Sequence, residues 1–200
     1  MKILLVGGTG TIGKRIYWRL QDAHEIITAG SKSGDVQVDM TDPHSIEEMF
    51  TKTGKLDAMV VAAGGAPMAP VQELTQEHFY EGIRSKMMGQ INLALIGQKH
   101  LNPGGSITLT SGILSEDPIA LGAVLSTINS AVNGFVIGAS GELLRQGIRI
   151  NVVSPGIVED SAEAIGSYFP GHNPVPMERV VNGYLKSILG ICTGQVIKAY

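Results

Sequence analysis

Short runs of apolar residues alternate with longer helical patterns along the whole chain. The runs that predict strands are residues 2–6 (KILLV), 25–29 (EIITA), 36–38 (VQV), 57–63 (DAMVVAA), 105–110 (GSITLT), 149–154 (RINVVS) and 195–200 (QVIKAY). Helical patterns lie between them, at residues 14–20, after Pro43, at 75–100, after Pro118 and at 178–189. Several runs contain consecutive apolar residues rather than an alternation of apolar and polar ones, which is typical of strands that a parallel sheet buries on both faces. Repeated β–α–β units predict an α/β fold, with one domain over residues 1–200 and a doubly wound parallel sheet of about seven strands.

The stretch from Pro118 to Gly141 contains no charged residue and is nearly long enough to cross a membrane. Its middle is crowded with small polar side chains, namely Ser126, Thr127, Asn129, Ser130 and Asn133. Lipid would penalise so many polar groups on one helix. We therefore expect a helix that protein buries on most sides, and no membrane partner.

Composition narrows the function classes further. The net charge of −3 and the absence of any run of Lys and Arg argue against a nucleic-acid partner. The single cysteine, Cys192, excludes an intrachain disulfide and a cysteine-rich metal site, so no metal is expected and a reducing compartment fits. The first apolar stretch stops at Gly7, which is too short for the core of a secretory signal. These observations predict a cytoplasmic protein.

The most informative motif is VGGTGTIG, which follows the first predicted strand and opens a helix. Its glycines let backbone approach a phosphate closely, and the helix N-terminus offers free N–H groups to a pyrophosphate. This motif in this position predicts a dinucleotide-binding Rossmann fold. The residues expected to contact the pyrophosphate are those of the loop: Gly7, Thr9, Gly10, Thr11, Ile12 and Gly13. A plain strand-to-helix turn is the alternative.

The end of the second strand helps to distinguish NAD from NADP. An acidic residue there binds the ribose 2′-hydroxyl, whereas basic and hydroxyl groups accept a 2′-phosphate. This chain has Ser31, Lys32 and Ser33 after Gly30, which favours NADP, while the nearby Asp35 leaves NAD open. A solvated polar turn is the alternative.

The stretch GIRINVVSPGIV (147–158) resembles short-chain dehydrogenases/reductases. The glycine loop, Asp39-Met40 after the third strand and AAGG (62–65) after the fourth extend the resemblance over nearly the whole chain. The resemblance implies a nicotinamide cofactor. The residues it places beside that cofactor are Asp39 and Met40 at the adenine, Ala62, Ala63 and Gly64 at the adenosine ribose, Thr110, and Pro155, Gly156 and Ile157 at the nicotinamide.

The chain departs from this family at the catalytic positions. The family reduces carbonyls with a tyrosine as proton donor, a lysine four residues later, a serine that holds the substrate oxygen and an asparagine in the preceding helix. Ser111 matches the serine, but the tyrosine position falls at Leu125, the lysine position at Asn129 and the asparagine position at Lys86. No Tyr-x-x-x-Lys sequence occurs anywhere in the chain.

The candidate catalytic residues are therefore Ser111, Lys86 and Asn129. Ser111 could donate a hydrogen bond to a developing oxyanion. Lys86, if it points inward, could supply positive charge or a proton, and Asn129 could hold the nicotinamide ribose. Tyr168 and His172, in the irregular stretch 155–177, are further candidates for an acid. The alternative for Lys86, Tyr168 and His172 is an ordinary solvated or loop side chain.

Several functions fit these residues. The favoured one is an NADP-dependent oxidoreductase with non-standard proton delivery, acting on a small carbonyl or quinone-like substrate that is already activated. A catalytically inactive dinucleotide-binding or sensing protein is the alternative, and an isomerase is a weaker third. By resemblance, the helices at 75–100 and 118–145 would form a homodimer or homotetramer.

Overall fold

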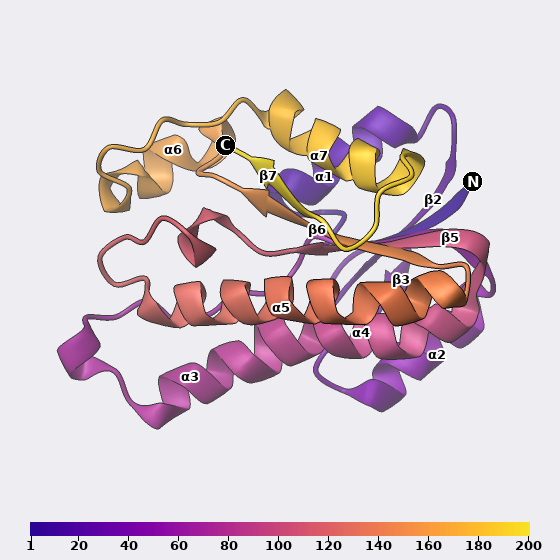
Figure 1. Cartoon of the computed structure of the whole chain (residues 1–200), viewed down its shortest axis with the longest axis horizontal. Helices are drawn as coiled ribbons and strands as arrows, with labels where there is room; N and C mark the ends of the chain where they lie inside the picture. Colours follow the sequence, from indigo (N-terminus) through magenta and orange to yellow (C-terminus); the bar gives the residue numbers. More distant parts are fainter.

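Seven parallel strands form one sheet in the order β3-β2-β1-β4-β5-β6-β7 (Figure 1). The computed structural model describes residues 1–200. The strands are β1 (Lys2–Val6), β2 (Glu25–Gly30), β3 (Val36–Gln37), β4 (Leu56–Val61), β5 (Leu101–Thr110), β6 (Arg149–Pro155) and β7 (Val196–Ala199). The predicted doubly wound parallel sheet is confirmed. Because the strand order reverses between β1 and β4, the carboxyl ends of these strands border a crevice, where such sheets commonly bind ligands.

Helices cover both faces of the sheet and bury a separate apolar cluster on each (Figure 1). On one face lie α2 (Pro43–Thr53), α3 (Gln76–Gly82), α4 (Gly89–Gly97) and α5 (Ala123–Arg145). On the other lie α1 (Thr11–Leu20) and α7 (Met177–Leu189), with α6 (Glu159–Ile165) near the ends of the strands. Strands such as β1 and β4 contribute side chains to both clusters, which explains why consecutive residues in them are apolar.

The expectation that the uncharged helix begins at Pro118 is wrong, because α5 begins at Ala123. Leu121 has a left-handed backbone with φ of 67°, which a right-handed helix cannot include. Its carbonyl accepts a hydrogen bond from the Ala69 N–H at 3.3 Å, so a distant segment holds this turn. By length and composition alone α5 could cross a membrane, since an 18-residue window within it has a mean hydropathy of 1.3. In this fold, however, it lies against the sheet, packed on β6, with Val132 and Val136 in the core.

The helix predicted at residues 75–100 is present but interrupted. A single π-helical turn, Ile83–Met88, joins α3 to α4, and a 3₁₀ turn (Gln98–His100) ends the segment. A π turn inserts an extra residue, so it changes which side chains face inward after it. Turns of this kind are frequent at functional sites, and this one contains Lys86.

The stretch 155–177 is more regular than its sequence suggested. It contains α6 and a 3₁₀ turn (Gly166–Tyr168), and Val158 pairs with Val175 in an isolated bridge. The Arg15 guanidinium on α1 binds the Asp160 carboxylate on α6 at 2.7 Å, which ties this stretch to the helix that follows the glycine loop.

Candidate functional site

Two neighbouring cavities lie at the carboxyl ends of the strands. The larger, of about 460 Å³, is bordered by the loop after β1 and is called the glycine-loop cleft. The smaller, of about 200 Å³, contains Lys86 in its wall and is called the Lys86 cavity. Gly64 belongs to the first wall and packs against Lys86 in the second, so the two cavities adjoin.

Most residues predicted to contact a dinucleotide line one of these cavities. The glycine-loop cleft is lined by Gly7, Thr9, Gly10, Ser31, Lys32, Ser33, Asp39, Met40, Ala62, Ala63 and Gly64. The Lys86 cavity is lined by Ile12, Lys86, Ser111, Asn129, Pro155, Gly156 and Ile157. Thr11, Gly13 and Thr110 line neither.

The glycine loop is shaped by close backbone contacts. A Cβ on Gly7, whose φ is +86°, would lie 2.4 Å from the Ala62 carbonyl oxygen. A Cβ on Gly13 would lie 2.0 Å from the Gly7 carbonyl oxygen, so Gly13 has a packing role at the start of α1. No side chain caps the N-terminus of α1, where Gly10 occupies the capping position. The free N–H groups of this first turn therefore remain available to an anion.

The turn after β2 presents hydroxyls and a lysine to the cleft. Thr9 Oγ1 and Ser33 Oγ lie 2.9 Å apart, which joins this turn to the glycine loop. The Asp35 carboxylate instead accepts hydrogen bonds of 2.8 Å from the N–H and the hydroxyl of Thr28. These bonds, led by the one from the Thr28 backbone, lower the pKa of Asp35. Asp35 thus pairs with Thr28 of β2 and does not line the cleft.

Asp39 and Met40 form another part of the cleft wall. The Asp39 carboxylate accepts hydrogen bonds from the Thr41 hydroxyl at 2.7 Å and from the Thr41 N–H at 2.9 Å, which lower the pKa of Asp39. The Met40 side chain packs against Gly89 at the start of α4, where a Cβ would lie 2.4 Å from Met40 Cε. This wall combines a fixed carboxylate with an apolar surface.

Lys86 points inward. Lys86 is only 8% exposed, and its Nζ donates a hydrogen bond to the Ser111 carbonyl oxygen at 3.1 Å. Burial lowers the pKa of Lys86 to about 8, because the charged form loses its hydration. The alternative of a solvated lysine is wrong.

Ser111 and Asn129 bring unpartnered polar atoms to the same cavity. Ser111 Oγ and Asn129 Oδ1 are buried and have no hydrogen-bond partner within the protein. Buried polar atoms without partners are rare in folded proteins, so each calls for an explanation. A ligand with one donor and one acceptor would satisfy both. Leu125 stands one helical turn before Asn129 and also lines the cavity.

Thr110 is oriented away from both cavities. Its hydroxyl donates to the Val61 carbonyl at 2.6 Å and lies 2.7 Å from the Tyr184 hydroxyl, while its N–H and C=O pair with the buried Gln90 side chain. Desolvation raises the pKa of Tyr184, a fully buried residue of α7. Thr110 therefore helps to fix the end of β5 next to Ser111.

The further candidate acids lie outside the Lys86 cavity. Tyr168 is exposed on the 3₁₀ turn of residues 166–168. His172 Nε2 lies 3.7 Å from the Asp117 carboxylate. The structure does not bring either residue together with Ser111.

Sequence reasoning missed the apolar walls of the Lys86 cavity. They come from the loop after β5 and from the segment around α6, and include Ile113, Leu114, Val158, Ile165 and Phe169. The apolar residues of the irregular stretch 155–177 were the available signal, because a purely solvated loop would not need them.

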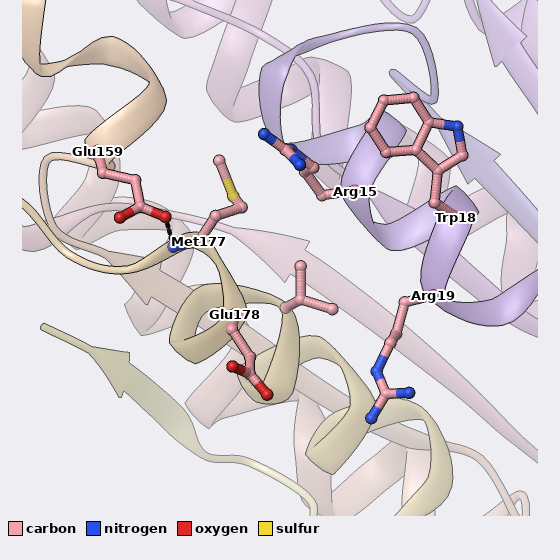
Figure 2. Close-up of a pocket in the computed structure, with 7 residues that line it drawn as sticks. Arg15, Trp18, Arg19, Glu159, Met177 and Glu178 are labelled. Carbon is pink, nitrogen blue, oxygen red and sulfur yellow. Dashed lines mark hydrogen bonds between the residues drawn. The ribbon is translucent and has the colours of Figure 1, made fainter.

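A separate groove of about 440 Å³ lies between α1 and α7 (Figure 2). Arg15, Trp18 and Arg19 of α1 line one side, and Met177 and Glu178 of α7 line the other. Glu159 accepts a hydrogen bond from the Met177 N–H at 2.9 Å. None of the residues predicted to bind or catalyse lines this groove.

Comparison with known proteins shows the family to which this chain belongs. A family model described as enoyl-(acyl carrier protein) reductase matches residues 16–180. The chain belongs to the short-chain dehydrogenase/reductase family. The structure of lin1944 from Listeria innocua is similar over 100% of both chains, with 46% identity and a TM-score of 0.97.

Other members of the short-chain dehydrogenase/reductase family are more distant. A small-chain dehydrogenase in complex with NADPH is 28% identical, with a TM-score of 0.87 over 99% of this chain and 95% of its own. An uncharacterized oxidoreductase of Methylorubrum extorquens is 31% identical over 137 residues, which are 66% of this chain and 55% of the relative. Hydroxynaphthalene reductase arp2 of Aspergillus fumigatus is 26% identical over 161 residues, 76% of this chain and 59% of the relative. The chain thus spans less than two thirds of these two curated relatives.

Proposed function

We propose that this protein is a cytoplasmic NADPH-dependent oxidoreductase that reduces a small, already activated carbonyl or quinone-like acceptor. Residues 1–200 would serve as one dinucleotide-binding domain. The observation that carries the proposal is the buried Ser111 hydroxyl, unpartnered, in a cavity that adjoins the glycine-loop cleft. A cofactor held in the cleft would supply a hydride, and the cavity would hold the acceptor.

The cleft suits NADPH in several respects. The N-terminus of α1 would receive the pyrophosphate, and Asp39, Met40 and the segment 62–64 would hold the adenosine. Ser31, Lys32 and Ser33 would take the 2′-phosphate. The Asp35 carboxylate does not oppose that phosphate directly, because it is occupied by Thr28. The NADPH complex of the small-chain dehydrogenase, a relative with the same fold, supports the same choice.

In the Lys86 cavity, the Ser111 hydroxyl would donate a hydrogen bond to the acceptor oxygen, where negative charge develops. The Asn129 amide would hold the nicotinamide ribose, and Pro155, Gly156 and Ile157 would frame the nicotinamide. The apolar walls would exclude water from the reacting atoms.

A catalytically inactive dinucleotide-binding protein is the second candidate. The observation in its favour is that Leu125 faces the cavity from the position where family enzymes have a tyrosine. Helix α5 contains neither tyrosine nor lysine. Such a protein would bind NADPH tightly and turn over no acceptor.

We also propose a homodimer or homotetramer that forms through α4 and α5. An apolar groove of about 380 Å³ lies between these helices and includes Leu95, Phe135 and Leu143. Ile137 and Leu144 of α5 are exposed large apolar side chains. Association would remove this surface from water.

The experiment that tests the function measures NADPH binding by quenching of Trp18 fluorescence or by calorimetry. NADPH oxidation is then followed with a panel of quinones, 1,2-diketones and aldehydes. Ser111→Ala should lose about 100-fold in kcat on its best acceptor, as for loss of one oxyanion donor. Ser130→Ala, on the exposed side of α5, is the matched control and should behave as wild type. Binding without turnover of any acceptor would favour the inactive protein instead.

A further inference from the structure

We propose that Lys86 is the acid that protonates the acceptor oxygen in this protein. The inference rests on the proposed reductase function and assigns a proton donor, which the proposed function does not yet include. It follows from the position of Lys86, from its surroundings and from the absence of competing acids in the same cavity.

Lys86 lies next to the residue that would hold the acceptor. Its Nζ is 3.1 Å from the carbonyl oxygen of Ser111, and both residues line the Lys86 cavity. A lysine ammonium has three N–H donors, of which this hydrogen bond uses one. The remaining donors are free to approach an oxygen that Ser111 Oγ also contacts.

The local backbone is built to bring Lys86 inward. The π-helical turn Ile83–Met88 contains Lys86, and its widened geometry alters the inward face of this segment. Gly64 makes room for it, because a Cβ there would lie 2.9 Å from Lys86 Cα. The same Cβ would lie 3.2 Å from Lys86 Cβ and Cγ, so the inward path of the side chain also depends on this glycine.

No other group in the cavity can donate a proton near neutral pH. Among the residues that line it, Lys86 is the one with a titratable side chain. No carboxylate pairs with Lys86, since it takes part in no salt bridge. Burial lowers the pKa of Lys86 to about 8, which is close to the range where a general acid is most effective.

The tyrosines of the chain do not compete for this role. Tyr184 is buried on the far side of β5, where its hydroxyl pairs with Thr110. The Tyr200 backbone and Cβ lie behind Gly156, and Tyr168 is exposed on its turn. None of them lines the cavity.

Hydride transfer to carbon and proton transfer to oxygen together reduce the acceptor carbonyl to an alcohol. The acceptor carbon receives a hydride, with its electron pair, from the reduced cofactor, which becomes oxidised. The C=O π pair moves onto the acceptor oxygen, while Ser111 Oγ–H hydrogen-bonds that oxygen. An N–H bond of the Lys86 ammonium breaks, and its proton forms the new O–H bond. Lys86 is left as a neutral amine and regains a proton from solvent after the alcohol leaves.

The test compares wild type with Lys86→Met, Lys86→Arg and the matched control Arg84→Met. Arg84 lies on the same π turn, but its side chain is exposed and pairs with Glu77. The probe is 1-phenyl-1,2-propanedione, and kcat is measured between about pH 6 and 10. The NADPH dissociation constant is measured in parallel. The Lys86 Nζ environment is followed by NMR of lysine labelled with ¹³C at Cε, with Lys86→Met assigning the resonance.

If Lys86 is the acid, wild-type kcat falls as pH rises through about 8. Lys86→Met should lose about 100-fold or more in kcat and the falling limb with it, a loss typical of a missing general acid. Lys86→Arg should move the limb beyond the measured range, because a guanidinium stays charged. The NMR titration should give the same midpoint as the kinetic limb, and Arg84→Met should match wild type.

Two results would overturn the inference while leaving the reductase function in place. One is a Lys86→Met enzyme that keeps the falling limb or loses less than threefold in kcat. The other is a Lys86 resonance that titrates above pH 10. If wild type binds NADPH but reduces no acceptor, the proposed function fails instead, and the two failures are thus distinguished.

Discussion

Gly64 lies directly against Lys86: a Cβ on Gly64 would stand 2.9 Å from Lys86 Cα and 3.2 Å from Lys86 Cβ and Cγ. Gly64 also has φ of +97°, a conformation that side chains with a Cβ rarely adopt. Gly64, which follows β4, therefore has two structural roles. It lines the glycine-loop cleft, and it leaves the space in which Lys86 turns toward Ser111.

Gly64→Ala should be destabilising for both reasons. We expect a loss of about 2–3 kcal/mol in the free energy of unfolding, or roughly 5–10 °C in Tm for a chain of this size. Thermal unfolding by circular dichroism measures it. The control is Gly65→Ala, since a Cβ on Gly65 meets nothing within 4 Å and its φ is not positive. Equal Tm values for the two variants would mean that the contact with Lys86 carries no strain.

Lys86→Met should change how stability depends on pH. The folded-state pKa of Lys86, about 8, lies below its ordinary value of 10.5, so the unfolded chain binds more protons between these two values. Wild-type stability should therefore rise with pH relative to Lys86→Met in that window, by on the order of 3 kcal/mol. Below pH 8 the difference should be constant. Urea unfolding of both proteins at pH 7 and pH 10 measures the effect. If the difference in unfolding free energy between the two proteins were the same at both pH values, the pKa of Lys86 would not be lowered by folding.

The layered fold was predictable because strands such as β1 and β4 contain consecutive apolar residues, and burial on both faces favours that pattern. The start of α5 was not predictable. Pro118 is a typical first residue of a helix, but the turn around Leu121 is held by a hydrogen bond from Ala69, which no local pattern reveals.

The positions of the site residues along the sheet were predictable, but the direction of one key side chain was not. Ser111 and the glycine loop follow strand ends, so their placement follows from the sheet. The inward direction of Lys86 could not be derived from a regular helical period, because the π turn inserts an extra residue. The binding of Asp35 to Thr28 depends on the conformation of the turn, and the sequence left it open.

Lys32→Ala should weaken NADPH binding selectively. Loss of a charge-assisted contact to the 2′-phosphate should raise the NADPH dissociation constant about 10-fold, while the NADH value changes less than twofold. Calorimetric titration with both cofactors measures this. Lys52→Ala, on the exposed side of α2 away from the cleft, controls for net charge. An equal loss for both cofactors would show that Lys32 does not read the phosphate.

Ile137→Glu should prevent association through α4 and α5. Ile137 is 57% exposed in the single chain, and a carboxylate there would have to be desolvated in an interface. We expect the variant to sediment as a monomer, whereas wild type sediments as a dimer or tetramer. Val71→Glu adds the same charge at an exposed position on a 3₁₀ turn and should not change the assembly. A wild-type monomer would contradict the proposed interface.

In the proposed function, the glycine-loop cleft holds NADPH with its reactive carbon facing the Lys86 cavity. The most direct test of this arrangement is transfer of deuterium from NADPH labelled at C4 of the nicotinamide, with the product analysed by mass spectrometry. The two C4 epimers of the label are tested separately with 1-phenyl-1,2-propanedione. One epimer should pass its deuterium to the product carbon, and the other should pass none. Tight NADPH binding with no deuterium in any product, from either epimer, would contradict it.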